Sequence, residues 1–354
     1  MMEVLGMGNL GLMVSAPPIQ TALQGVNCNA EQLMPWLVRS RAELGELKGF
    51  GELFRGREQL LQTHLLMDAV ENCILDQIQV TREAVLEGQL FNEAEQMPGV
   101  RSVMHYREAL QMGMDLISNG PLTTEGLLAI HAVLCGAAVS GKSKKSIQGI
   151  NLEGGESMDR ILHFANRDEK HLDPLARCIV AYGLFEVIRP FPDCNEGLSR
   201  IFLTLLLVQA GLLRFPVIGI NGYLRRSSEN IQRLLNDPGL LSNWSPFVKY
   251  MMHGFSIQAK ETRESLEKML QCYGQTDQGI REKCPEIYTP ELVFMLHALP
   301  VISPLRLSSR LDIHYTTATR YLKRLESEGF LQNRQSGKYQ LYINRQLMDL
   351  LVKQ

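Results

Sequence analysis

The sequence predicts a mainly α-helical protein that ends in a small winged helix-turn-helix, with three helices and a β-wing. Three observations support this fold class. Before residue 270, apolar residues recur at three- and four-residue steps in most segments, as in 60–70. Strand-like alternation is sparse before residue 338. After residue 290, a helix, a helix-turn-helix pattern and a hairpin pattern follow one another.

Composition and charge limit the classes of protein to consider. The chain has 354 residues, of which 45% are hydrophobic and 21% charged, as in ordinary globular proteins with two or three domains. A net charge of −2 excludes a uniformly basic nucleic-acid coat but not one local basic module. We find no apolar run of about 18 residues that would cross a membrane. The first 38 residues lack Lys and Arg, so no signal peptide is expected.

Cysteine usage indicates the redox compartment. Seven cysteines are dispersed along the chain without a Cys-x-x-Cys pair. This pattern is typical of reduced thiols and not of a disulfide framework. We therefore expect a cytoplasmic protein that has no membrane partner.

Local patterns give the expected elements of the helical part. An irregular lead-in marked by Gly and Pro (4–24) precedes a mostly helical stretch (30–87). Further helices are expected at 103–117, 127–135, 175–188, 200–213, 224–235 and 244–269. A Gly-, Ser- and Lys-rich segment (136–155) and the stretch 189–197 are expected to be loops, and 274–285 a linker.

The C-terminal segment has the order of a winged helix. A short helix (291–299) stops at Pro300, and Ser303-Pro304 opens a second helix (305–311). A turn (312–314), an amphipathic helix (315–329) and an alternating hairpin (331–343) follow. The expected core is apolar and comprises Leu307, Leu311, Ile313, Ala318, Leu322, Leu325 and Phe330.

The same segment carries a local positive charge. Between residues 290 and 354 there are nine Lys or Arg and five Asp or Glu, a net charge of +4. Threonines open the third helix, basic residues follow on one of its faces, and two more flank the wing tip, where winged helices contact bases and phosphates. The predicted DNA-contacting residues are Thr316, Thr317, Thr319, Arg320, Lys323, Arg324, Arg334 and Lys338. Protein–protein contact or dimerisation is the alternative use of such a module.

One segment of the helical part carries a recognisable motif. Residues 189–200, the signature segment, read RPFPDCNEGLSR and resemble the HPFxDGNGRxxR signature of the Fic family. Resemblance extends to LFEVI (184–188), HYREAL (105–110), Ile130-His131, WSPF (244–247) and Gln258-Ala259, and the winged helix resembles that of a Fic subgroup.

This resemblance implies a Fic-type helical bundle followed by the winged helix. The domains would be an N-terminal helical region of Fic type (1–115), the Fic core with the degenerate signature segment (116–273), a linker (274–289) and the winged helix-turn-helix (290–354).

The signature segment departs from the family where the family does its chemistry. The family's His is a general base toward a target hydroxyl that attacks ATP, whereas Arg189 stays protonated and cannot accept that proton. Cys194 and Glu196 replace the two glycines of the phosphate cradle, and a carboxylate there repels polyphosphate by roughly 1 kcal/mol or more. The family's first Arg is Gly197. Adenylyl transfer by the family's usual route is therefore not expected.

Several family residues remain. Asp193 matches the Mg²⁺-binding carboxylate, Asn195 the residue that braces the loop, and Arg200 the second Arg, so with Arg189 they are remnants of a site for ATP with Mg²⁺. Asp193 equally suits a helix cap and Arg200 a structural ion pair. Cys194 suits either a nucleophile beside Arg189 or a small space-filling residue.

Two regulatory features of the family are also altered. The family's inhibitory Ser-x-x-x-Glu-Gly corresponds to residues 72–77, with Asn72 for Ser, Asp76 for Glu and Gln77 for Gly. In this register Asp76 would reach Arg200. The family's target-docking hairpin should lie between His131 and Asp173, where we find Lys142, Lys144 and Lys145 and an expected turn at Gly154-Gly155.

Three hypotheses follow from these patterns. The first is a catalytically degenerate Fic homologue, not an enzyme, that acts as a DNA-associated regulator, as a homodimer or with a protein partner. The alternative is a nucleotide-dependent protein adenylyltransferase, or related transferase, with an atypical active site. A third hypothesis is a module that inhibits an active Fic enzyme by forming a heterodimer with it.

Overall fold

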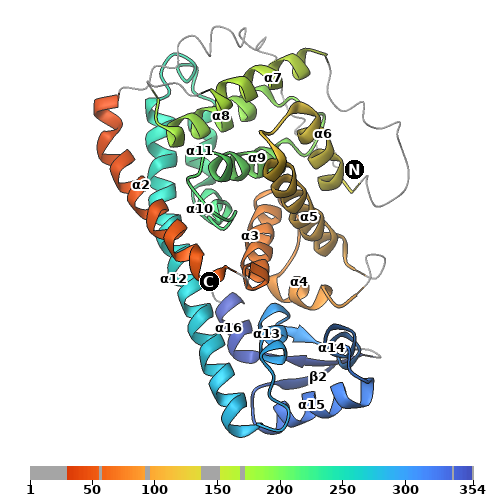
Figure 1. The fold of residues 1–354 in the computed structure, drawn as a ribbon. Coiled ribbons are helices and arrows are strands. Elements are labelled where there is room, and N and C mark those ends of the chain that lie inside the picture. The colour runs from red at the N-terminus through yellow and green to blue at the C-terminus, as the bar shows by residue number, and fades with distance from the viewer. Residues whose placement is uncertain are drawn as a thin grey trace, which may run out of the picture.

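The computed structural model describes residues 30–55, 58–91, 96–136, 152–167, 172–336 and 339–352. Its helical body is followed by a smaller C-terminal part (Figure 1). The body consists of α2 (Ala30–Gly51), η1 (Glu52–Phe54), η2 (Glu58–Leu60), α3 (Leu61–Leu75), α4 (Arg82–Gly88), α5 (Pro98–Asn119), α6 (Thr124–Leu134), α7 (Leu152–Asn166), α8 (Pro174–Ile188), α9 (Asn195–Gln209), α10 (Ile220–Arg226), α11 (Ser228–Leu235) and α12 (Ser245–Lys283). The mainly α-helical fold class is thus confirmed.

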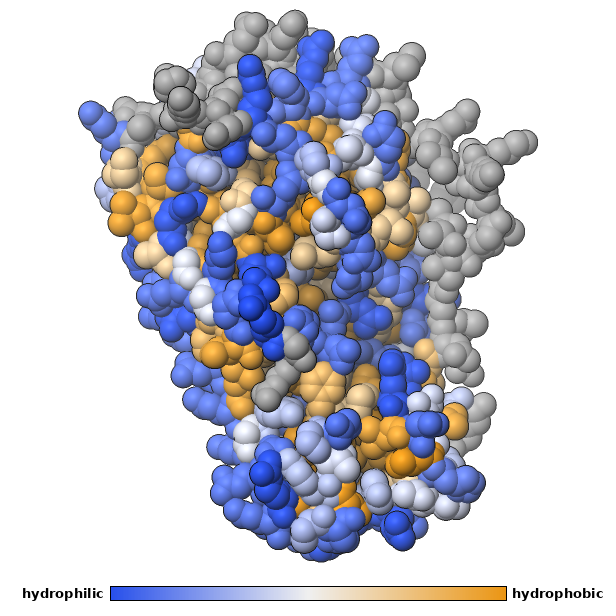
Figure 2. All heavy atoms as spheres, viewed as in Figure 1, coloured by the Kyte–Doolittle hydropathy of each residue, from blue (hydrophilic) through white to orange (hydrophobic). Residues whose placement is uncertain are grey.

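Helices α8 and α9 form the centre of the body. Nearly every side chain of α9 is buried, because α5, α6 and α8 cover it on different sides. Gly183 in α8 lets α12 approach closely, since a Cβ at this position would lie 2.6 Å from Trp244 Cζ3. The signature segment joins the two central helices and is therefore anchored at both ends by the core. Over the face shown in Figure 2, hydrophobic residues form separate groups among hydrophilic ones.

The longest helix joins the body to the C-terminal part. Helix α12 packs along α2 and continues downward to the winged helix (Figure 1). The predicted linker at 274–289 is wrong for most of its length, because α12 runs to Lys283. Cys272, Thr276 and Ile280 are buried at four-residue spacing, so burial on one face outweighs the cost of Gly274 and Gly279.

The C-terminal part is a winged helix, as predicted. It contains α13 (Pro290–Ala298), β1 (Val301–Ile302), α14 (Pro304–Leu311), α15 (Tyr315–Ser327), β2 (Gln332–Ser336), β3 (Tyr339–Ile343) and α16 (Arg345–Val352). The antiparallel sheet has the order β1-β3-β2, with Val301 and Gln332 both paired to Ile343. The sequence analysis missed β1 and α16. Its expected core is buried at Leu307, Ala318, Leu322 and Leu325 and partly buried at Leu311, Ile313 and Phe330.

Other expectations of the sequence analysis need correction. The turn expected at Gly154-Gly155 lies inside α7, whose Met158, Ile161 and Leu162 face the core and favour the helix. The helix expected at 224–235 is broken at Ser227, whose hydroxyl donates to Tyr223 O over 2.8 Å. The lead-in at 4–24 and the lysines at 142, 144 and 145 lie outside the described residues.

A buried acid holds the winged helix onto the body. The Glu71 carboxylate accepts hydrogen bonds from Arg82 over 2.7 Å and from Arg225. The same Arg82 donates to the carbonyl oxygens of Leu351 and Val352 at 3.1 and 3.2 Å, at the end of α16. The Glu71–Arg82 pair therefore connects four helices: α3, α4, α10 and α16. None of the described helices is long and apolar enough to cross a membrane.

A second polar group ties α3, α5 and α10 together. The Asn221 side-chain amide donates to Asp68 Oδ2 at 3.0 Å and to the hydroxyl of Tyr106 at 3.2 Å. Asp68 Oδ1 is buried without a hydrogen-bond partner. Burial, and then the charge of Glu71, raise the pKa of Asp68 to about 7. The carboxyl group is therefore partly protonated near neutral pH.

This raised pKa makes the stability of the protein depend on pH. An unfolded Asp titrates near 3.9, so the folded state is disfavoured as pH rises from about 4 to 7. Asp68→Asn removes this loss, and its advantage over wild type should grow by about 2–4 kcal/mol across that range. Urea unfolding of both proteins at several pH values measures the difference. Parallel pH profiles would contradict the prediction.

Candidate functional site

The loop part of the signature segment is held in one conformation by its own residues. Helix α8 ends at Ile188 and Arg189 takes the left-handed conformation, with φ of 49°. The Phe191 ring is buried, and the Asn195 side chain bonds both the N–H of Phe191, at 3.0 Å, and its carbonyl oxygen. Asn195 thus makes the loop-bracing contacts that the family resemblance implies for it.

Left-handed backbone persists where the Fic signature has glycine. Cys194 has φ of 53° and Gln77 has φ of 61°, and both stand at positions that the resemblance assigns to Gly. A side chain in this conformation costs on the order of 1 kcal/mol. Both turns therefore have a left-handed residue that favours glycine, although neither residue is glycine in this chain.

Arg200 is enclosed by groups from the helix that the resemblance assigns to inhibition. Its Nε donates to Asn72 Oδ1 at 2.6 Å, and its Nη2 pairs with Asp76 Oδ1. Burial by itself lowers the pKa of Arg200, but the charge of Asp76 and other neighbouring acids raises it above its ordinary value. The contact expected between Asp76 and Arg200 is present, so this guanidinium is neutralised within the chain.

Glu196 lies in the first turn of α9, where the family resemblance implies a phosphate cradle. Its carboxylate pairs with Arg189 across the start of α9. Burial opposes ionisation of Glu196, but hydrogen bonds from its own backbone N–H and from Arg189 hold its pKa below the usual range. A negative charge therefore lies at the N-terminus of α9, the helix end at which the family resemblance implies phosphate binding.

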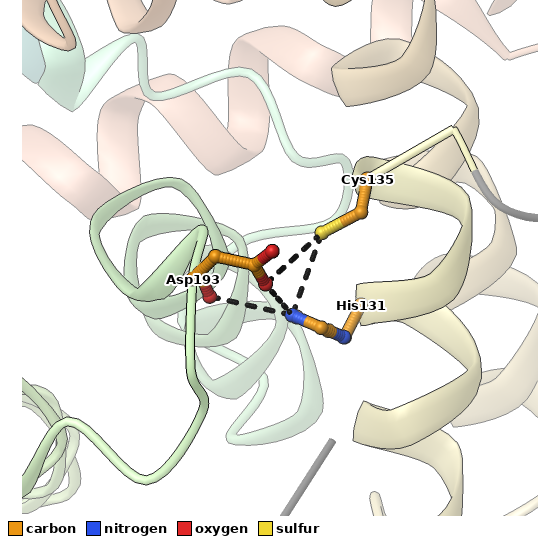
Figure 3. Close-up of side chains that lie close together, drawn as sticks. All are labelled: His131, Cys135 and Asp193. Atoms are coloured by element: carbon orange, nitrogen blue, oxygen red, sulfur yellow. Dashed lines mark hydrogen bonds and ion pairs between the residues drawn. The ribbon is translucent and has the colours of Figure 1, made fainter. Parts of the chain in front are cut away.

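A second group of side chains meets beside the loop (Figure 3). Asp193 Oδ1 lies 2.8 Å from Nε2 of His131, and Cys135 Sγ lies 3.4 Å from the same nitrogen. Cys135 Sγ also contacts Cys194 Sγ at 2.9 Å. Asp193 does not cap α9, because the N-cap residue is Cys194 and no side chain caps this end. These donor atoms can hold a metal ion.

These residues were not expected to meet. The family resemblance placed His131 on a helix and Asp193 at Mg²⁺, and it implied no role for Cys135. The available signal was the spacing of His131 and Cys135, four residues apart and therefore on one helix face. Their meeting with residues 193 and 194 depends on the packing of α6 against α9.

Helix α15 presents part of the predicted DNA-contacting set to solvent. Thr316, Arg320 and Lys323 are exposed, and Thr317 and Thr319 are half-buried. Thr319 Oγ1 donates to the carbonyl oxygen of Tyr315 at 2.9 Å. These five residues lie on the N-terminal two-thirds of the helix, so they form one polar and basic surface.

The other three predicted residues are placed differently. Arg324 bonds Glu286 at 2.8 Å, Glu328, and the Lys283 carbonyl oxygen at 2.8 Å. Arg334 in β2 pairs with Glu87 of α4. Both arginines therefore fasten the winged helix to neighbouring parts of the chain. Lys338 lies outside the described residues.

A basic cavity lies between the body and the winged helix. Its volume is about 490 Å³, and Arg101 and Arg107 of α5 line it together with Arg306 and Arg310 of α14. Burial, and then the charge of Arg310, lower the pKa of Arg306. Four glutamines complete much of the polar lining: Gln59, Gln62, Gln89 and Gln96. Glu108 is the one acid among the described lining residues, so the four arginines leave the lining a net positive charge that favours an anionic ligand.

Comparisons with known proteins agree on one family. Residues 34–115 match the Fic/DOC family N-terminal model, and residues 273–347 match the model of the protein adenylyltransferase SoFic-like C-terminal domain. A probable protein adenylyltransferase of Aquifex aeolicus (strain VF5) is 49% identical over 47 residues, which is 13% of this chain and only 15% of that protein. A crystal structure of a Fic family protein from Desulfovibrio desulfuricans G20 covers 87% of this chain and 96% of its own, with a TM-score of 0.52 and 17% identity. The last similarity concerns the fold alone.

The enclosure of Arg200 leads to a stability prediction. Asp76→Ala leaves a buried guanidinium, whose side chain is 5% exposed, without its charged partner. We expect a loss of about 3 kcal/mol in the free energy of unfolding, measured in urea. Glu196→Gln, at an ion pair whose side chains are 53% and 42% exposed, is the control and should cost under about 1 kcal/mol. Equal losses in the two variants would mean that Arg200 is not locked by Asp76.

Proposed function

The chain is a member of the Fic family, and we propose that it acts as a regulatory protein that binds DNA through its winged helix. Its Fic body then serves as a scaffold and does not transfer adenylyl groups. The observation that carries this proposal is the engagement of the phosphate-binding groups by acids of the same chain. Asp76 neutralises Arg200, and the Glu196 carboxylate stands at the N-terminus of α9.

Chemistry at position 189 supports the same proposal. A guanidinium is protonated at any physiological pH and cannot remove a proton from a target hydroxyl. In the described part of the loop, Arg189 is engaged with Glu196. A triphosphate would have to displace one acid from Arg200 and lie against another at the helix N-terminus. Both steps oppose binding electrostatically.

The exposed surface of α15 supports the DNA-binding part of the proposal. Recognition helices of winged helices place their N-terminal residues against base edges in the major groove. Here that position carries Thr316 and Arg320, with Lys323 one turn further along. Tyr315 at the start of the helix is 50% exposed, although it is a large side chain. Threonine, arginine and lysine side chains supply the hydrogen bonds that phosphates and base edges accept.

The way in which the winged helix is attached suits regulation. It is joined to the body by the continuous helix α12 and by the contacts of Arg82 with α16. The basic cavity has lining residues from both parts, so an anionic effector bound there would contact α5 and α14 together. Because the two parts share the cavity, such binding is expected to change how the winged helix meets DNA.

The DNA-binding proposal is tested with the full-length protein. Sheared DNA from the source organism is captured at roughly physiological salt and sequenced. We expect a small set of shared sites, bound at least about tenfold more weakly by the variant Arg320→Ala/Lys323→Ala. The control Arg233→Ala/Lys260→Ala removes the same charge from exposed positions of the body and should retain binding. Equal recovery of DNA by both double variants would overturn the proposal.

The competing function is a nucleotide-dependent transferase, which the name of the Aquifex relative favours. Calorimetric titration with ATP and Mg²⁺ at millimolar concentration separates the two. We expect no measurable heat of binding and no label on protein after incubation with labelled ATP. Transfer of label that Arg200→Lys abolishes would establish the transferase and reject the scaffold role.

A further inference from the structure

Side chains from α6 and from the signature segment converge on one point. His131 and Cys135 are one helical turn apart, at the last turn of α6 and just after it, and Asp193 faces them from the loop (Figure 3). Nε2 of His131, Sγ of Cys135 and a carboxylate oxygen of Asp193 all lie within 4.8 Å of one another. We propose that this group, the His131–Cys135–Asp193 cluster, binds a transition-metal ion of the Zn²⁺ type.

The distances between the donor atoms suit a single tetrahedral ion. Bond lengths of about 2.0 Å to nitrogen or oxygen and 2.3 Å to sulfur place ligand atoms about 3.4–3.6 Å apart around Zn²⁺. The three separations are 2.8 Å for Nε2 to Oδ1, 3.4 Å for Sγ to Nε2 and 3.6 Å for Sγ to Oδ1. Only the nitrogen–oxygen pair has to open, by about 0.6 Å. Rotation of the exposed Asp193 side chain is enough for this.

The kinds of donor atom select the class of ion. Mg²⁺ and Ca²⁺ prefer oxygen ligands throughout, whereas imidazole and thiolate suit Zn²⁺, Co²⁺ and copper. Cys135 loses its proton to solvent when its sulfur bonds the metal, and the imidazole binds as the neutral base. One thiolate and one carboxylate then balance the two positive charges of the ion. This chemistry differs from that of an oxygen site for Mg²⁺ with ATP.

A fourth donor lies next to the cluster. Cys194 Sγ is 2.9 Å from Cys135 Sγ, and it belongs to a residue in the left-handed conformation at which glycine would be unstrained. Cys194 therefore makes this backbone conformation less favourable than glycine would. Binding of the second sulfur to the same ion would complete four-coordination, with the two sulfur atoms moving apart to the separation of about 3.8 Å that two thiolates have on one tetrahedral Zn²⁺.

The surroundings hold the ligands in place. The imidazole of His131 stacks on the ring of Phe191, with centroids 4.6 Å apart and planes inclined by 24°. Phe191 is buried and its backbone is bonded on both sides by Asn195. The His131 side chain is 13% exposed and that of Asp193 is 64% exposed, so an ion can enter from solvent. A bound ion would fasten the end of α6 to the signature segment.

The test uses the full-length protein, reduced with a phosphine and freed of metal with a chelator. Titration with Co²⁺ alone, followed by displacement with Zn²⁺, gives stoichiometry and ligand type. We expect one ion per chain, a thiolate-to-cobalt charge-transfer band and the intense visible bands of tetrahedral cobalt. Cys135→Ser and Asp193→Asn should each weaken binding by about 100-fold. Cys272→Ser, which changes a buried thiol of α12, should bind as wild type does.

Several outcomes would overturn the proposal. Among them are absence of stoichiometric binding by the reduced protein, a cobalt spectrum without the thiolate band, and unchanged affinity in Cys135→Ser. Free thiols are also counted before the protein is reduced. If Cys135 and Cys194 then form a disulfide, and the reduced protein binds no metal, the two residues are a redox pair and the metal proposal is wrong. The metal proposal is independent of the DNA-binding proposal. The double variant Arg320→Ala/Lys323→Ala, which should lose DNA binding, is expected to bind metal as wild type does.

Discussion

The buried guanidinium of Arg200 is the interaction on which the arrangement around the signature segment depends. It lies on α9, in the centre of the body, and its partners Asn72 and Asp76 come from the end of α3. A buried charge is tolerated only when it is paired and hydrogen-bonded. The position of α3 against α9 is therefore coupled to Arg200, the residue that the family resemblance assigns to phosphate binding.

Around Arg200 the backbone conformation suits the Fic signature, but several side chains differ from it. Cys194 and Gln77 adopt the left-handed conformation in which glycine is unstrained, and Asn195 braces the loop through Phe191. The side chains placed on this frame are an acid at the helix N-terminus, a guanidinium in place of the general base, and thiols beside an imidazole. At and beside the positions where the family resemblance implies N–H groups that bind phosphate, this chain therefore carries an imidazole and thiols, which are donors of a softer kind.

The winged helix is not a separate body on a flexible tether. Helix α12 passes from the core of one part to the core of the other, and Arg82 fastens α16 to Glu71. Arg324 and Arg334 contribute to this docking through Glu286 and Glu87. Basic residues of the winged helix thus serve two purposes: Arg324 and Arg334 dock it onto neighbouring parts of the chain, whereas Arg320 and Lys323 on α15 are directed to solvent.

The order of helices and the winged helix could be predicted from the sequence, because apolar spacing and turn residues are local signals. The signature segment could be recognised in the same way, whereas the contact of Asp76 with Arg200 was implied by the family resemblance and not by any local pattern. Local composition failed at 274–283 and at Gly154-Gly155, where burial of one helix face outweighs the cost of glycine.

Apart from Asp76 and Arg200, the tertiary structure alone decided which distant residues meet. It brought Cys135 to residues 193 and 194, gave Arg324 and Arg334 intramolecular partners, and placed four arginines around a cavity between the two parts. The sequence determined the elements and the chemistry that each residue offers. The packing of α6 on α9 and of the winged helix on the body decided where that chemistry is assembled, because contacts between distant segments leave no local periodicity.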